Sequence, residues 1–260
     1  MARVLVVQHE PTSPPARFRV WLEEAGCALD VRECHRGDTL PPLAQYDGLL
    51  VLGGSMDADQ DADFRWLPLV RAHIREAARR GVPTLGLCLG HQLATLALGG
   101  TVGRNPYGVM LGVLDVGWGC EVLLDPLVGR IAGEGRAFHW NQDVATTLPP
   151  GADVLARGAH GEVQAARLAP TVWGLQFHPE IDAAVIAQWA ALDDGDDGHE
   201  GDGGHDGDRG ALGRAGLTPQ AVVAQVRDAA AELEAAWAPL ARSFATLVRG
   251  RAAASGSGWE

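Results

Sequence analysis

Short runs that are apolar at nearly every position recur along the chain, and several are followed by a segment whose apolar residues have helical spacing. A run that is apolar throughout is typical of a β-strand covered on both faces. The runs expected to be such strands are RVLVVQ (3–8), YDGLLVLGG (46–54), PTLGLC (83–88) and TVWGLQF (171–177). ALDVREC (28–34) alternates as a further strand would, and the expected helices are PARFRVWLEEAG (15–26), about 64–80 and LGHQLATLAL (89–98).

Strands that alternate with helices predict parallel β-α-β units with right-handed crossovers. Between about residues 109 and 172 the stretches become shorter and are separated by Gly and Pro, which predicts hairpins. These stretches are GVLDVGW, CEVLL, ADVLARG and EVQAARL. We therefore expect an α/β fold with an open, mostly parallel, flavodoxin-like sheet, helices on both faces and a hairpin-rich antiparallel extension. In such sheets ligands bind at the carboxyl ends of the strands, where Gly53–Gly54 and Cys88 fall.

The C-terminal part of the chain changes in composition. The tract DDGDDGHEGDGGHDGDRG has almost no apolar side chains to bury, which predicts disorder. Helical spacing returns after Thr218, a good N-cap that is followed by Pro219, and Pro239 should end or kink that helix. The expected divisions are a main domain (1–192), a disordered acidic insertion rich in Asp, Gly and His (193–216), a C-terminal helical segment packed on the domain (217–250) and a flexible tail (251–260).

Composition excludes several classes of protein. The net charge of −12 argues against a nucleic-acid-binding surface, which needs clustered basic side chains. No run approaches the roughly 20 apolar residues of a membrane span, and the N-terminal run is too short for a signal peptide. The four cysteines show no CxxC spacing, and the acidic tract lacks the fixed ligand spacing of a calcium loop. We expect a cytoplasmic protein with no metal site, no disulfide and no cofactor.

The sequence GLCLG (86–90) carries the clearest chemical signal. It places Cys88 between two glycines at the point where an apolar strand should turn into a helix, the pattern of a nucleophile elbow. The helix N-terminus favours a thiolate and offers free N–H groups to a developing oxyanion. At the end of another expected strand, QFHPE supplies His178 as a base and Glu180 as a group that could orient its imidazole. The alternative interpretation is that these are a structural cysteine, a core histidine and a surface acid, but the pattern favours a catalytic role.

GLCLGHQ, GLQFHPE and VLGG together resemble the signatures of class I, triad-type glutamine amidotransferases. The layout is most similar to the stand-alone GMP-synthase-like members, and the resemblance covers roughly residues 3–189. It implies that Cys88 attacks the carboxamide of glutamine while His178 moves protons and Glu180 orients His178. The roles that it implies for other residues are an oxyanion hole formed by the N–H groups of Gly54 and Leu89, and substrate binding by Gly53 and Gln92.

Two positions depart from that family pattern. Ser55 follows the glycine pair where relatives often have proline, and we expect the turn to survive with a slightly altered shape. Asn141 stands where GMP-synthase-like members often carry histidine, which bears on the acceptor or partner rather than on glutamine hydrolysis. His91 is expected to pack or cap the first helical turn, and His139 and Asp143 are expected to be loop residues rather than catalysts.

The resemblance implies a glutaminase that releases ammonia through a Cys88 thioester. No GxxxxGK[ST] loop occurs in the chain, so we expect the synthetase that uses the ammonia to be a separate polypeptide. One alternative is a γ-glutamyl amide hydrolase that degrades γ-glutamylated amines with the same residues. A second alternative is a non-catalytic regulatory protein that has kept the fold. Neither nucleic acid nor a membrane is an expected partner.

Overall fold

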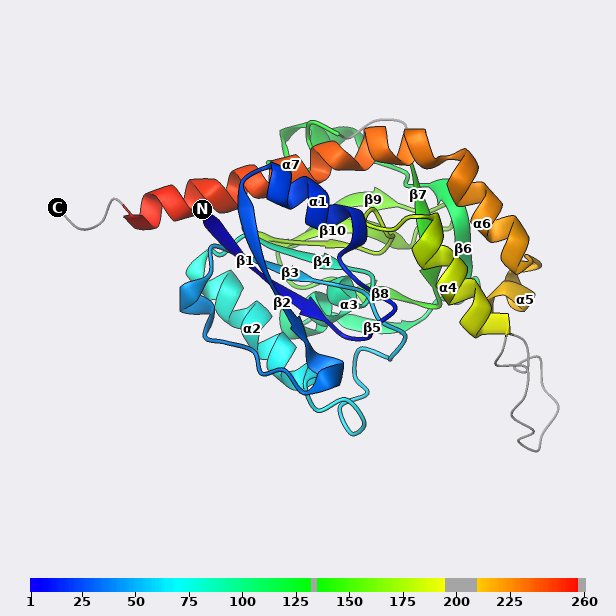
Figure 1. Ribbon diagram of the computed structural model, residues 1–260, viewed down its shortest axis with the longest axis horizontal. Helices are drawn as coiled ribbons and strands as arrows, with labels where there is room; N and C mark the ends of the chain where they lie inside the picture. The colour runs from blue at the N-terminus through cyan, green and yellow to red at the C-terminus, as the bar shows by residue number, and fades with distance from the viewer. Residues whose placement is uncertain (132–134, 195–209, 257–260) are drawn as a thin grey trace.

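A seven-stranded sheet lies at the centre of the computed structural model, which describes residues 1–131, 135–194 and 210–256 (Figure 1). The strand order is β2-β1-β3-β4-β11-β10-β9, and the pairs from β2 to β11 are parallel. These strands are β1 (Ala2–Gln8), β2 (Cys27–Glu33), β3 (Gly48–Val51), β4 (Thr84–Leu87), β9 (Asp153–Arg157), β10 (Val163–Ala169) and β11 (Val172–Leu175). The expected mostly parallel α/β sheet is confirmed.

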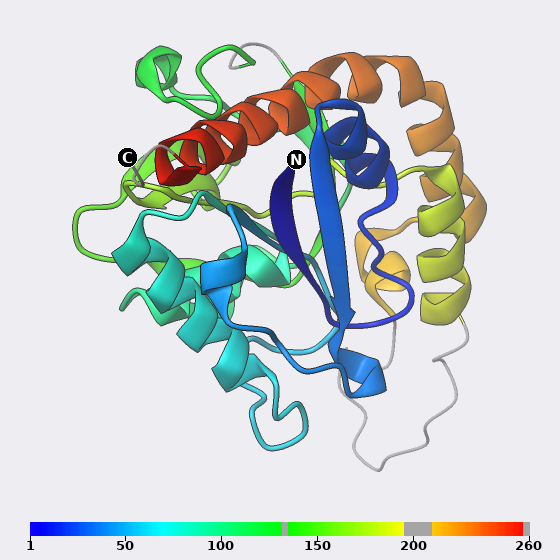
Figure 2. The ribbon, with the colours of Figure 1, turned by 60° about the vertical axis from the view of Figure 1, so that its left-hand side comes forward.

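Helices cover both faces of this sheet (Figure 2). Side chains alternate along β1, so that Val4 and Val6 join one buried cluster while Leu5 and Val7 join the other. The first cluster is closed by α1 (Ala16–Glu24) and α7 (Ala230–Gly256), and the second by α2 (Leu67–Arg80) and α3 (Leu89–Ala97). Because both faces are buried, the central strands are apolar at almost every position.

The antiparallel extension has two parts. β9 and β10 continue the central sheet, while β5 (Thr101–Arg104) pairs with β8 (Asp143–Thr147) and β6 (Met110–Asp115) pairs with β7 (Arg136–Asn141). The sequence predicted CEVLL to be a strand, but the structure has a 3₁₀ helix at Cys120–Leu124. Among the described side chains of this segment only Val122 is buried, and Leu124 is 94% exposed, so the segment has no continuous apolar face to pair in a sheet.

The segment 193–216 is partly helical, in contrast to the expected disorder. α4 (Ala183–Asp194) extends into its start and α5 (Ala211–Ala215) lies near its end, whereas 195–209 fall outside the described residues. Asp193 joins the two helices, because its carboxylate accepts hydrogen bonds from the N–H groups of Ala211 and Leu212, both at 2.8 Å. The buried side chain of Leu212 anchors α5 in the main core.

The C-terminal helices pack on the domain. α6 (Pro219–Asp228) begins at Thr218, whose hydroxyl accepts a hydrogen bond from the N–H of Ala221 at 3.2 Å. α7 then continues through Pro239 instead of ending there, and it reaches six residues into the expected tail 251–260. Arg251 explains this extension, because its guanidinium donates to the carbonyl oxygens of Arg80 and Gly81 at the end of α2.

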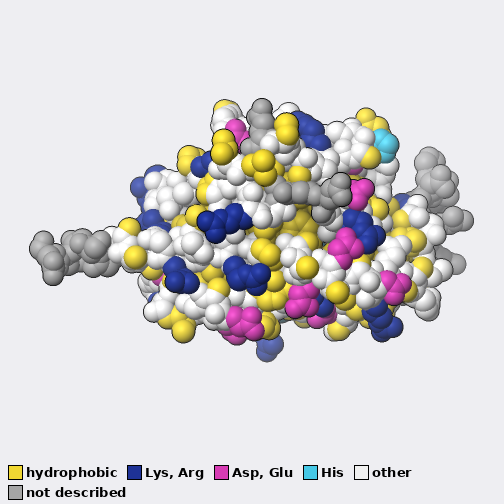
Figure 3. Space-filling model, turned by 90° about the horizontal axis from the view of Figure 1, so that it is seen from above, with side chains coloured by type: hydrophobic (Ala, Val, Ile, Leu, Met, Phe, Trp, Pro, Cys, Tyr) yellow, Lys and Arg dark blue, Asp and Glu magenta, His cyan; other side chains and the backbone are white. Residues whose placement is uncertain are grey.

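The outer face near α7 carries basic and acidic side chains interspersed with apolar ones (Figure 3). Arg17 and Arg136 form ion pairs with Glu234 and Glu232 of this helix, so part of its charge is locally balanced. Within the described ranges no helix, α7 included, is both long and apolar enough to cross a membrane.

Candidate active site

Cys88 occupies the corner between β4 and α3 in a strained conformation. Its φ of 48° and ψ of −105° lie in a region that residues other than glycine rarely adopt. Two backbone hydrogen bonds hold it there: its N–H donates to the Leu175 carbonyl at 2.8 Å, and its carbonyl accepts from the Gln92 N–H at 3.1 Å. The corner is thus fixed from both the neighbouring strand and the following helix.

The two glycines beside Cys88 are required by close backbone approaches. A Cβ atom at Gly86 would lie 2.4 Å from the carbonyl oxygen of Gly90, and one at Gly90 would lie 2.1 Å from the carbonyl oxygen of Val51. Both contacts are with backbone, which cannot rotate away as a side chain can. The first turn of α3 can therefore sit against β3 and β4 only when both positions are glycine.

His178 and Glu180 follow β11 and form a buried pair. Nδ1 of His178 lies 2.8 Å from Oε1 of Glu180, and the two residues are 4% and 3% exposed. The backbone fixes both positions, because the His178 N–H donates to the Phe138 carbonyl at 2.8 Å and the Glu180 carbonyl accepts from the Arg17 N–H at 2.9 Å. The ring of Trp189 meets the imidazole edge-to-face, with ring centroids 4.9 Å apart.

The electrostatics of the pair favour a charged imidazole. Burial alone lowers the pKa of His178, but the Glu180 carboxylate and the Cys88 sulfur outweigh it and raise that pKa to about 10. A charged imidazole beside a cysteine is the arrangement on which cysteine nucleophiles depend. Sulfur, imidazole and carboxylate thus meet in one place, although Cys88 and His178 are far apart in the sequence.

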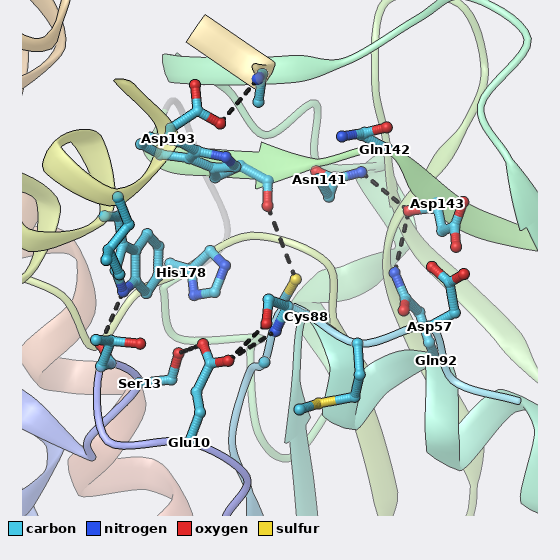
Figure 4. Close-up of a pocket in the computed structure, with 18 of the residues that line it drawn as sticks. Glu10, Ser13, Asp57, Cys88, Gln92, Asn141, Gln142, Asp143, His178 and Asp193 are labelled. Atoms are coloured by element: carbon cyan, nitrogen blue, oxygen red, sulfur yellow. Dashed lines mark hydrogen bonds between the residues drawn. The ribbon is translucent and has the colours of Figure 1, made fainter. Parts of the chain in front are cut away.

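Cys88 and His178 both line a pocket of about 390 Å³ (Figure 4). Nε2 of Gln176 donates toward the Cys88 sulfur at 3.6 Å, and the thiol points to the carbonyl oxygen of Trp140 at 4.0 Å. The other lining residues are Glu10, Thr12, Ser13, Gly54, Ser55, Met56, Asp57, Gln92, Arg104, Trp140, Asn141, Gln142, Asp143, Trp189, Leu192, Asp193 and Ala211. The volume falls in the range of about 300–1,000 Å³ that is usual for small-molecule sites.

The glycine turn after β3 lies directly against the catalytic candidates. A Cβ atom at Gly53 would lie 3.0 Å from Cε1 of His178, and one at Gly54 would lie 3.0 Å from Cδ2 of Leu89. Leu89 is the first residue of α3, so its N–H has no acceptor inside the helix. Gly54 therefore lies beside the first residue of α3, and of Gly53, Gly54 and Leu89 only Gly54 lines the pocket.

Glu10 supports this turn in a way that proline could not. Oε2 of Glu10 accepts hydrogen bonds from both the N–H and the hydroxyl of Ser55, at 3.2 and 2.7 Å. Oε1 accepts from the Ser13 hydroxyl at 2.7 Å. A proline at this position would have neither an N–H nor a hydroxyl and could not make this contact.

On the opposite side of Cys88 the pocket is polar. Gln92 donates to the carbonyl of Asp143 at 3.1 Å, and Asn141 donates to the same oxygen at 3.0 Å. Arg104 forms ion pairs with Asp143 at 3.1 Å and with Asp57 at 3.4 Å. Burial raises the pKa of Asp143 in spite of Arg104. Asp143 belongs to β8 and not to a loop, so that expectation is wrong for this residue.

His91 and His139 are buried outside the pocket lining. His91 packs against Gly174 of β11, and a Cβ atom at Gly174 would lie 2.0 Å from Nδ1 of His91. Burial lowers the pKa of His91 to about 4. His139 lies in β7 rather than in a loop, and burial, followed by the nearby His178, lowers its pKa to about 3. Their ring nitrogens have no hydrogen-bond partner within the described structure. Both positions suit neutral packing histidines.

Several residues in the pocket or in contact with Cys88 were missed by sequence reasoning, and two had a readable signal. Glu10 follows the carboxyl end of β1, the edge of a parallel sheet where ligands bind. Gln176 lies two residues before His178 at the end of TVWGLQF, a run that predicts a strand, and alternation along a strand would direct both side chains to one face. Trp140, Trp189 and Arg104 had no such signal, because only tertiary packing brings their elements to Cys88. Among the described residues no group of three or more His, Cys, Asp or Glu side chains could hold a metal ion.

The chain is similar to several known proteins. Residues 20–186 match the family model of class-I glutamine amidotransferases. A subunit of the glutamine-hydrolysing GMP synthase of Halobacterium salinarum is 31% identical over 183 residues, which cover 70% of this chain and 90% of that protein. Gamma-glutamyl peptidase 4 of Arabidopsis thaliana is 28% identical over 146 residues, covering 55% of this chain and 57% of that protein.

A solved glutamine amidotransferase from Thermotoga maritima shares the fold, with a TM-score of 0.77, 23% identity, and coverage of 95% of this chain and 98% of that chain. The family model spans more than half of the sequence and includes both Cys88 and His178. The chain therefore belongs to the class I glutamine amidotransferase family.

Proposed function

We propose that this protein hydrolyses the side-chain amide of glutamine through a covalent γ-glutamyl thioester on Cys88. The observation that carries the proposal is the meeting of the strained Cys88 corner with the buried His178–Glu180 pair in one pocket. A nucleophile, a base and a group that orients the base are the parts that covalent amide hydrolysis requires.

In the proposed reaction the Cys88 thiolate attacks the carboxamide carbon and forms a C–S bond. The N–H groups of Gly54 and Leu89 stabilise the oxyanion, and each such donor contributes about 3–4 kcal/mol in comparable enzymes. His178 then gives a proton to the leaving nitrogen as the C–N bond breaks, and ammonia departs. Water, activated by His178, cleaves the thioester to release glutamate and restore Cys88. Glu180 holds the imidazole in place, and Gly53 and Gln92 shape the substrate pocket.

A glutamine-analogue electrophile such as 6-diazo-5-oxo-norleucine tests the nucleophile. We expect mass spectrometry to find the label on Cys88, while the exposed thiol of Cys120 serves as an internal control for general reactivity. Replacement of Cys88 by alanine should lower glutamate release by at least about 10³-fold. Labelling of Cys120 without labelling of Cys88 would instead favour the non-catalytic regulatory role.

We further propose that the released ammonia is used by a synthetase on a separate chain. The support is the likeness to one subunit of a glutamine-hydrolysing GMP synthase, together with the lack of a GxxxxGK[ST] loop in this sequence. Affinity purification of the native protein, followed by identification of the bound chain, tests this. A nucleotide-binding synthetase that co-purifies and raises glutamate release would support the proposal, and an enzyme fully active alone with no such partner would contradict it.

The second candidate is hydrolysis of a γ-glutamyl amide larger than glutamine. It is favoured by the likeness to a gamma-glutamyl peptidase and by a pocket that extends well beyond the sulfur. Glutamate release from glutamine and from γ-glutamyl amines distinguishes the two candidates, because strong turnover of the amines with little turnover of glutamine would favour the second.

A further inference from the structure

The position of His178 determines on which side of Cys88 the leaving group must lie. A general acid has to reach the leaving nitrogen, because it delivers the proton that the departing amine carries away. In Figure 4 His178 lies on one side of Cys88, whereas Gln92 and Asn141 lie on the other. The amino-acid part of a γ-glutamyl substrate therefore faces Gln92, and the leaving nitrogen faces His178.

The pocket continues beyond His178 on the leaving-group side. Its wall there comes from the segment after β1, which supplies Glu10 and Ser13, and from α4, which supplies Trp189 and Asp193. Figure 4 shows Glu10, Ser13 and Asp193 on the same side of Cys88 as His178. Ammonia alone would not need this additional space.

Two carboxylates on this wall accept their hydrogen bonds from uncharged donors. Glu10 accepts its hydrogen bonds from the hydroxyl groups of Ser13 and Ser55 and from the Ser55 N–H, which are neutral donors. Asp193 accepts from the N–H groups of Ala211 and Leu212, which are also neutral. On the opposite side of the pocket, in contrast, the carboxylates of Asp57 and Asp143 share the guanidinium of Arg104.

Trp189 adds an aromatic surface to the same wall. Its indole N–H donates to the Thr12 carbonyl at 2.7 Å, and its ring contacts His178, so the side chain is held in place on the leaving-group side. Carboxylates combined with an indole ring suit an organic cation, which gains from both charge attraction and cation–π contact.

We propose that Glu10, Trp189 and Asp193 form a subsite for the leaving amine of a γ-glutamyl amide, and that this amine carries a second, positively charged amino group. The inference rests on the proposed hydrolytic function and extends it to a substrate class, the γ-glutamyl amides of diamines. The reaction is the same as with glutamine: the C–S bond forms, the amide C–N bond breaks, and His178 gives one proton to the departing diamine. Water then releases glutamate from Cys88.

The test compares two isosteric amides, γ-glutamyl-1,4-diaminobutane and γ-glutamyl-pentylamide, which differ only by a terminal ammonium or methyl group. We expect kcat/KM to be about tenfold higher for the cationic amide, since partly buried ion pairs and cation–π contacts together contribute about 1–2 kcal/mol. The preference should shrink at 0.5 M salt, because salt screens the attraction. Glu10→Gln and Asp193→Asn should each lower the ratio of the two kcat/KM values about threefold, while Glu24→Gln, on an exposed part of α1, should keep it.

The ratio is informative because a general loss of activity in a variant affects both amides equally. Hydrolysis of glutamine and of both amides with a ratio below about two would overturn this inference and leave the proposed function intact. If glutamate is released from none of the three substrates, the proposed function fails. Binding of the two amides to the Cys88→Ala variant then tests whether the subsite exists. Calorimetry should find the cationic amide bound about tenfold more tightly, and equal or absent binding of the two amides would overturn the inference.

Discussion

Replacement of Glu180 by glutamine isolates the charge of the buried carboxylate, because the two side chains have nearly the same shape. The Glu180 oxygen lies 2.8 Å from His178 Nδ1, with both groups almost fully buried. Unit charges about 4 Å apart attract by about 4 kcal/mol at an effective dielectric constant of about 20. Without that attraction only the Cys88 sulfur still opposes the effect of burial, so the pKa of His178 falls from its raised value and the imidazolium form is less favoured.

Two measurements follow from this change. Glutamate release by Glu180→Gln should fall by about 10²–10³-fold in kcat/KM, since 1.36 kcal/mol corresponds to a factor of ten. Alkylation of Cys88 by iodoacetamide at pH 7 should also slow, because a less favoured imidazolium supports the thiolate less, while alkylation of the exposed Cys120 stays unchanged. The matched control is Glu24→Gln, which removes the same charge from an exposed position. If Glu180→Gln keeps more than a third of the wild-type kcat/KM, the charge of Glu180 does not support catalysis through His178.

Two further predictions concern stability. Gly90→Ala should lower the free energy of unfolding by at least about 3 kcal/mol or prevent folding, because its Cβ atom would lie 2.1 Å from the Val51 carbonyl oxygen. Gly250→Ala, whose Cβ atom would have nothing within 4 Å, should stabilise α7 by about 0.5–1 kcal/mol. Equal urea midpoints for the two variants would contradict this. Three buried histidines have pKa values lowered by burial, namely His9 (about 3), His91 (about 4) and His139 (about 3). Below pH 6.5 the unfolded chain binds protons at these sites and the folded chain does not, so the free energy of unfolding should fall by up to about 1.4 kcal/mol per histidine and pH unit from pH 6.5 toward pH 4. Urea unfolding at pH 7, 6 and 5 measures the slope, and a stability that is flat over this range would refute the assignment.

The regular parts of the fold were predictable because burial on two faces leaves a clear trace in the sequence. The apolar runs of β1, β3, β4 and β11 and the helices between them were all expected, and the structure confirms them. CEVLL was misread as a strand because its apolar residues are consecutive, although all but Val122 of its described aliphatic side chains are exposed. The continuation of α7 past Pro239 also escaped prediction, since tertiary contacts with the core and with the end of α2 stabilise it.

The catalytic candidates were read from local motifs, and their roles stay predictions until the variants are measured. Cys88 and the glycines around it could be found because a strained corner needs those residue types at that spacing. The family was likewise recognisable from GLCLGHQ and GLQFHPE, and the comparisons confirm it. Glu10 and Trp189 could not be joined to Cys88 in this way, because nothing local in their segments records which other segment they face.

The sequence by itself determined the layered α/β fold, the family and the chemical identity of the groups at Cys88, His178 and Glu180. These features depend on local patterns, namely the period of apolar residues and the glycines that a sharp corner needs. Only the tertiary structure decided what surrounds the sulfur. The Glu10–Ser55 contact, the ring of Trp189 and the balance of charge across the pocket come from strands and helices that meet in space through packing, and no spacing along the chain encodes those distances.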